Sequence, residues 1–141
     1  MTGRKVLTAG VFDLLHFGHF ELFRRAKELA GNDGTLTVGV KDDAAVARDK
    51  PQARLFYSWE TRAGMIRALR FVDCVIPYDV VDRLVAEVEF DILVVGGDQT
   101  HPGIQRAVAW CEEHGKDVVR LSRTAGVSSS LLRQGVMSDF V

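Results

Sequence analysis

Short apolar runs alternate along this chain with segments in which apolar residues recur every three or four positions. The apolar runs lie at residues 6–9, 36–40, 74–77, 92–96 and 118–121. Their length is typical of buried strands, and the three- to four-residue spacing between them is typical of amphipathic helices. Strands that alternate with helices predict a parallel sheet covered by helices on both faces. We therefore expect one α/β domain, doubly wound and Rossmann-like, with a five-stranded parallel sheet.

Two further segments lie between the second and third of these apolar runs. Residues 47–57 carry Pro51 and four charged side chains, which predicts a mobile loop. Ser58 then has the character of an N-cap for a helix that runs to about residue 69.

The composition limits the classes of protein to which the chain can belong. Its 141 residues, 47% of them hydrophobic, fit a single domain spanning residues 1–141 with a substantial core. The net charge of −1 gives no overall field that favours nucleic acid or an anionic membrane, so neither is expected as a partner. Without a signal-like or membrane-spanning apolar run, a cytoplasmic protein is expected. Cys74 and Cys111 form no CxxC pair, which favours core packing over a disulfide or zinc site.

The most informative stretch is residues 9–19, AGVFDLLHFGH, which connects the first strand to a helix predicted from about residue 18 to residue 30. The first turn of a helix has unpaired N–H groups and the positive end of the helix dipole, so it favours anions such as phosphate. His16 and His19 are three residues apart and project from this turn toward one side. Gly18 allows a ligand to approach the backbone closely. A histidine at a helix start is, however, often only a cap or a solvent-facing residue.

This stretch resembles the HxGH signature of the cytidylyltransferase-like nucleotidyltransferase superfamily, with GVFD at residues 10–13 in place of its GxFD. Two other segments narrow the resemblance. Residues 62–77, RAGMIRALRFVDCVIP, are similar to the R…RYVDEVIP segment of glycerol-3-phosphate cytidylyltransferases, and residues 123–130, RTAGVSSS, to their RTxGISTT signature. The resemblance implies an enzyme that joins CTP to a small phosphorylated acceptor, by default glycerol 3-phosphate, and releases pyrophosphate.

The same resemblance assigns roles to individual residues. His16, His19 and Arg123 would stabilise the charge that develops on the phosphates during in-line transfer. The nucleotide would be contacted by further residues from four segments: Gly10, Val11, Phe12, Gly18, Lys50, Asp98, Thr124, Ser128 and Ser129. Arg62 and Arg70, placed on one predicted helix, would border the acceptor, although their pattern alone also fits a solvated helix face. Asp13 is expected to brace the turn rather than to react.

Cofactor and assembly are also implied. We expect Mg²⁺ to be bound through the nucleotide phosphates, because no cluster of side chains has the spacing of a protein metal cage. A homodimer is expected, with residues 70–77, RFVDCVIP, near its interface.

Several alternatives stay open at this point. Residues 96–103, GGDQTHPG, differ from the acidic, Trp-containing version of the glycerol-phosphate enzymes, and Val11 replaces a threonine. The chain could therefore be an adenylyltransferase of the same superfamily, of the type that makes heptose or flavin nucleotides. It could also be a cytidylyltransferase with another phospho- or phosphonate acceptor, or a non-catalytic nucleotide-binding module. Arg70 and residues 123–130 favour cytidine, and both histidines with Arg123 argue against a non-catalytic module.

Overall fold

Five parallel strands form one sheet in the order β3-β2-β1-β4-β5. The strands are β1 (Lys5–Gly10), β2 (Thr35–Lys41), β3 (Cys74–Tyr78), β4 (Ile92–Gly96) and β5 (Asp117–Leu121). In this computed structural model, residues 3–97 and 99–122 are described. The chain moves outward from β1 to β3, returns to β4 on the other side of β1, and moves outward again to β5. The predicted doubly wound parallel sheet is confirmed, and its strand order reverses between β1 and β4.

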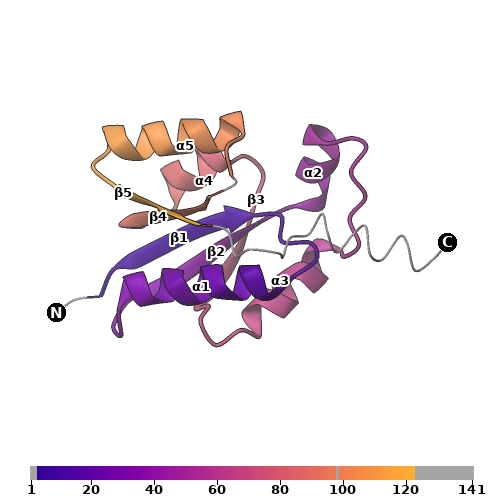
Figure 1. The fold of residues 1–141 in the computed structure, drawn as a ribbon. Helices are drawn as coiled ribbons and strands as arrows, with labels where there is room; N and C mark the ends of the chain where they lie inside the picture. The colour runs from indigo at the N-terminus through magenta and orange to yellow at the C-terminus, as the bar shows by residue number, and fades with distance from the viewer. Residues whose placement is uncertain (1–2, 98, 123–141) are drawn as a thin grey trace.

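Helices cover both faces of the sheet, as the pattern of apolar runs predicts. They are α1 (Phe17–Ala30), α2 (Asp43–Asp49), α3 (Trp59–Arg67), α4 (Val81–Glu87) and α5 (Pro102–Glu113). Figure 1 shows α1 and α3 below the sheet, and α4 and α5 above it, with α2 on the upper side next to the carboxyl end of β2.

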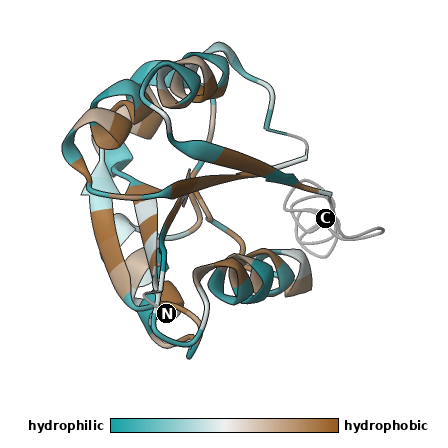
Figure 2. Ribbon diagram, turned by 90° about the vertical axis from the view of Figure 1, so that its left-hand side faces the viewer, coloured by the Kyte–Doolittle hydropathy of each residue, from teal (hydrophilic) through white to brown (hydrophobic). Residues whose placement is uncertain are grey.

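The strands are apolar because both of their faces are buried. Successive side chains of a strand point to opposite faces, so Val6 packs toward Phe23 of α1, whereas Leu7 packs toward Val85 of α4. In Figure 2 the hydrophobic colour gathers on the strands and on the inward sides of the helices. Among the described residues, no helix is both long enough and apolar enough to cross a membrane.

Three local predictions need correction. The predicted loop at residues 47–57 begins only at Lys50, because α2 precedes it: the Asp42 carboxylate caps this helix by accepting a hydrogen bond from the Ala45 amide at 2.7 Å. Ser58 caps α3 as predicted, but α3 ends at Arg67 rather than near residue 69. Cys74 is exposed, so core packing is correct only for Cys111.

Candidate active site

The strand order reverses between β1 and β4, and open α/β sheets bind ligands in the crevice at such a point, beyond the carboxyl ends of the strands. The β1–β4 pairing covers three residues of each strand and ends at Thr8 and Val94. Both strands continue beyond that pair, β1 to Gly10 and β4 to Gly96. The segment that carries the two histidines and the segment that follows β4 therefore leave the sheet at the same edge.

His16 and His19 cap the first turn of α1 reciprocally. The Nδ1 atom of His16 accepts a hydrogen bond from the Gly18 amide at 3.0 Å, and the Nδ1 atom of His19 accepts one from the His16 amide at 3.2 Å. The two imidazole rings are stacked with their centroids 3.9 Å apart, and both are half-buried. Two imidazoles thus form the capping box that serine and glutamate usually form.

This cap determines which ring nitrogen of each histidine carries a hydrogen. Because both Nδ1 atoms accept hydrogen bonds from backbone amides, we assign the hydrogen of each neutral ring to Nε2. Each Nε2 is then a donor, held at the N-terminus of a 14-residue helix whose dipole favours anions. The structure therefore brings His16, Gly18 and His19 together as predicted, and it makes the capping role part of the site rather than an alternative to it.

Phe12 packs its ring against His19 of this histidine pair. Its backbone φ angle is 54°, in the left-handed region that residues other than glycine rarely adopt. Its buried ring packs edge-on against His19 at 5.4 Å and against Phe23 at 5.2 Å. A Cβ atom on Gly10 would lie 2.9 Å from the Phe12 ring, so any larger residue there would force the ring to shift. Within the GVFD segment, Gly10 and Phe12 therefore shape the turn through packing.

Asp13 holds the loop that precedes α3 against the β1–α1 turn. Its buried carboxylate accepts hydrogen bonds from the Phe56 amide at 2.8 Å and the Tyr57 amide at 3.0 Å. The prediction that Asp13 braces the structure is confirmed. The segment to which it bonds, at Phe56 and Tyr57, lies more than forty positions after Asp13 in the sequence.

Arg62 has a different role from the predicted one. Its side chain is fully buried on the sheet-facing side of α3, so it does not lie on a solvated face, and its guanidinium bonds to other segments of the chain. Nε donates to the Tyr57 carbonyl at 3.1 Å, and Nη1 donates to the carbonyls of Val11 and Lys41, each at 2.9 Å. Nη2 pairs with the Asp43 carboxylate.

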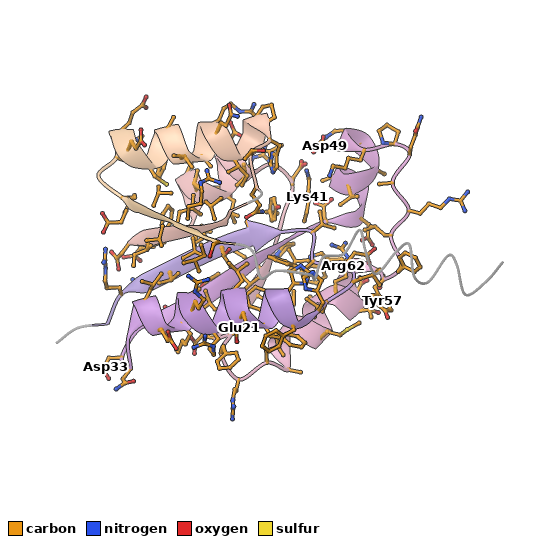
Figure 3. All side chains as sticks on the ribbon, viewed as in Figure 1. Glu21, Asp33, Lys41, Asp49, Tyr57 and Arg62 are labelled. Atoms are coloured by element: carbon orange, nitrogen blue, oxygen red, sulfur yellow. The ribbon has the colours of Figure 1, made fainter. Side chains whose placement is uncertain are left out.

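Figure 3 shows Arg62 at the centre of this region, between the carboxyl ends of the strands and α3. Its guanidinium ties together the β1–α1 turn, the end of β2, the start of α2 and the loop before α3. Arg70, by contrast, is exposed and lies beyond the end of α3, with its guanidinium over the Phe71 ring at 5.6 Å. The two arginines do not share a helix, and the prediction that they line one pocket from it is wrong.

Cationic and anionic side chains lie near His101, between α2 and the start of α5. Lys50 is exposed at the C-terminus of α2, and His101 immediately precedes Pro102 at the start of α5. Desolvation and neighbouring cations lower the pKa of His101 below its usual value. The cations are Lys41, Lys50 and Arg106. Sequence reasoning missed His101, because nothing in its local pattern indicates that charged side chains of β2 and α2 lie near it.

The other predicted site residues lie outside the part of the chain that the structure describes: Asp98, Arg123, Thr124, Ser128 and Ser129. Within residues 3–97 and 99–122, no group of three or more histidine, cysteine, aspartate or glutamate side chains is arranged to hold a metal ion.

Comparison with known protein families and sequences gives consistent matches. Residues 7–135 match the family described as cytidylyltransferase-like. The bifunctional protein HldE of Nitrosococcus oceani is 39% identical over 127 residues, which cover 89% of this chain and 26% of that protein. The bifunctional protein HldE of Shewanella sp. strain W3-18-1 is 33% identical over 138 residues, covering 96% of this chain and 28% of that protein. The chain thus spans about a quarter of the length of these relatives.

Two solved structures share the fold over most of their length. The lipopolysaccharide core biosynthesis protein from Thermoplasma volcanium superposes with a TM-score of 0.68 at 27% identity, over 86% of this chain and 97% of that one. A protein of unknown function from Archaeoglobus fulgidus superposes with a TM-score of 0.67 at 25% identity, over 88% and 93% of the two chains.

Proposed function

The chain belongs to the cytidylyltransferase-like family, and from that premise we propose that it transfers the AMP group of ATP to a sugar phosphate and releases pyrophosphate. The observation that carries nucleotidyl transfer is the reciprocal cap of His16 and His19, which holds two Nε2–H donors at a helix N-terminus. The names of the relatives support the choice of donor and acceptor.

The sequence analysis kept as an alternative an adenylyltransferase of the type that makes heptose nucleotides. Relatives named HldE and a structural neighbour named for lipopolysaccharide core biosynthesis fit that alternative better than CTP and glycerol 3-phosphate, because lipopolysaccharide cores are built from activated sugars. Cytidylyl transfer is the second candidate. It is favoured by residues 70–73 and 123–130, which match the segments of glycerol-3-phosphate cytidylyltransferases.

In the proposed reaction, an oxygen of the acceptor phosphate attacks the α-phosphorus of the nucleotide. A bond forms between that oxygen and the α-phosphorus. At the same time the bond breaks between the α-phosphorus and the oxygen that bridges it to the β-phosphate, and the electron pair of this bond leaves with pyrophosphate. The protein forms no covalent bond, so its contribution is positioning and electrostatic stabilisation. The Nε2–H groups of His16 and His19 donate to the phosphate oxygens on which negative charge increases.

The remaining predicted contacts belong to this proposal. Arg123 offers a planar pair of donors that matches phosphate oxygens, and Lys50 offers a single charge from the end of α2. The hydroxyl groups of Thr124, Ser128 and Ser129 would bind the β- and γ-phosphates. Asp98 would contact the nucleotide beyond β4.

Mg²⁺ is the ion that we propose for the triphosphate. The described side chains suit an ion held mainly by phosphate oxygens and water, because they form no cluster of three metal ligands. When bound, the ion would offset negative charge on the triphosphate.

A panel of donors and acceptors tests the proposed function. We expect pyrophosphate release to have its highest kcat/KM with ATP and a hexose or heptose 1-phosphate, to stop in excess chelator, and to recover when Mg²⁺ is added. A higher kcat/KM with CTP and glycerol 3-phosphate would establish the second candidate instead. Absence of pyrophosphate release from every pair would contradict nucleotidyl transfer, and full activity in chelator would contradict the metal requirement.

We also propose that the chain forms a homodimer through the segment at residues 70–77. This segment includes most of β3, which is an edge strand among the described residues and pairs there with β2. Closed two-fold assemblies are the commonest oligomers, and an edge strand is a frequent place of contact. Light scattering at the assay concentration is expected to give twice the mass of one chain. A single-chain mass would contradict the dimer.

A further inference from the structure

We propose that Gln99 is a positioning residue that ties the two predicted nucleotide-binding segments together across the strand switch. The inference rests on the proposed function, because it concerns how the nucleotide site is held in shape. The first segment is residues 10–13, which begins at the last residue of β1. The second is residues 96–97, which begins at the last residue of β4 and comes just before Asp98 in the sequence.

The side chain of Gln99 connects β1 and β4 beyond the end of their backbone pairing. That pairing ends at Thr8 and Val94, where the Thr8 hydroxyl donates to the Val94 carbonyl at 2.9 Å. One residue further along β1, the Ala9 carbonyl accepts a hydrogen bond from Nε2 of Gln99 at 3.1 Å. Oε1 of the same side chain accepts a hydrogen bond from the Gly96 amide at 2.8 Å. One amide group therefore bridges the two strands at the point where the strand order reverses.

The backbone of Gln99 is fixed as well. Its amide donates to the Gly96 carbonyl at 3.1 Å, which ties the two ends of the GGDQ segment together. Nη1 of Arg120, on β5, donates to the carbonyls of Gly96 at 3.2 Å and Gln99 at 2.9 Å. Asp98, a predicted nucleotide contact, lies between these two tied residues in the sequence.

The chemistry of this bridge requires a primary amide. The side chain must donate to one backbone group and accept from another, and glutamine presents both functions on one planar group. Glutamate can accept from Gly96 but would place a carboxylate against the Ala9 carbonyl. Leucine, of similar size, can make neither hydrogen bond. Gln99 also belongs to the GGDQTHPG segment, in which this chain departs from the glycerol-phosphate enzymes.

The consequence for activity is specific to nucleotide binding. Ala9 directly precedes Gly10, and Gly96 directly precedes the remainder of the second segment, so the bridge holds both segments in place before nucleotide arrives. Loss of the bridge adds an ordering cost to binding, but it leaves the histidine pair on α1 unchanged. The variant should therefore lose nucleotide affinity rather than turnover at saturation.

Three variants of the full chain test the proposal: Gln99→Leu, Gln99→Glu and the control Gln105→Leu. Gln105 lies on α5, is exposed, and donates through Nε2 to the Thr100 carbonyl at 2.8 Å. The Kd of a non-hydrolysable ATP analogue is measured by calorimetry, kcat and KM for ATP by pyrophosphate release, and hydrogen exchange at the Gly96 amide by NMR.

For Gln99→Leu we expect Kd and KM to rise about tenfold, the equivalent of roughly one net hydrogen bond, with kcat within about twofold of wild type. Gly96 should exchange faster. Gln99→Glu should also raise Kd and KM, because it keeps the bond to Gly96 but replaces the bond to Ala9 with repulsion between two oxygens, and Gln105→Leu should match wild type.

Unchanged Kd and unchanged Gly96 protection in a folded Gln99→Leu protein would overturn the proposal, as would a fall in kcat with normal affinity. If Gln99→Leu does not fold, Gln99→Glu is held to the same criterion. If the wild-type chain binds no nucleoside triphosphate, both the proposed function and this inference are contradicted. If wild type and the Gln99 variants bind nucleotide equally well, this inference is contradicted and the proposed function is not.

Discussion

Replacement of either His16 or His19 by alanine is expected to lower single-turnover rates about 10²- to 10³-fold, which corresponds to the loss of one preorganised donor. The affinity for nucleoside triphosphate should change far less. The reason is that the charge on the phosphate oxygens increases in the transition state, so a donor aimed at it contributes more there than in the ground state. Melting temperature, nucleotide Kd and single-turnover rate are to be measured on the same samples.

The capping geometry supplies matched controls for this experiment. Alanine also removes a cap that is worth about 1 kcal/mol, so part of any change could come from fraying of α1. His16→Asn and His19→Gln place a side-chain acceptor near the position of Nδ1 and remove the imidazole. We expect these two variants to melt at a higher temperature than the alanine variants, but to have the same low single-turnover rates. Wild-type single-turnover rates in folded alanine variants would contradict a catalytic role for the pair.

The Arg62→Met variant is expected to lose about 3 kcal/mol of unfolding free energy in urea denaturation. Methionine fills much of the same space but leaves the carbonyls of Val11, Lys41 and Tyr57 without their donor. The Asp43 carboxylate is half-exposed and can be hydrated, so most of the cost comes from the carbonyls.

Arg67→Met is the matched control, because Arg67 lies on the same helix with its exposed guanidinium over the Trp59 ring at 5.6 Å. Its expected loss is below about 1 kcal/mol. Equal stability of the Arg62→Met and Arg67→Met variants would contradict the structural role of Arg62. So would a higher KM for the acceptor without loss of stability, since that is the behaviour of an acceptor ligand.

The sheet could be predicted from the sequence because its strands are buried on both faces and appear as separate apolar runs. Helix α2 could not, since it has only seven residues in a polar segment and buries just Ala45 and Val46. A helix this short is stabilised by its Asp42 cap and by packing rather than by a long apolar stripe.

The candidate site was predictable only where its geometry is local. His16 and His19 lie within one helical turn, so their spacing already places them together. Arg62 was misassigned because its partners are main-chain carbonyls from other segments, to which side-chain patterns give no clue. Gln99 was missed for the same reason: its role depends on where β1 and β4 stop pairing, a property of the sheet and not of the residues around Gln99.

The most direct test of the account is to follow an oxygen atom from acceptor to product. The wild-type chain is incubated with ATP and a sugar 1-phosphate whose phosphate oxygens are ¹⁸O, and the products are analysed by ³¹P NMR and mass spectrometry. Direct attack on the α-phosphorus predicts a nucleoside diphosphate sugar with ¹⁸O in the bridge between its phosphorus atoms, together with unlabelled pyrophosphate. Pyrophosphate that carries ¹⁸O, or a product whose bridging oxygen comes from ATP, would contradict nucleotidyl transfer at this site.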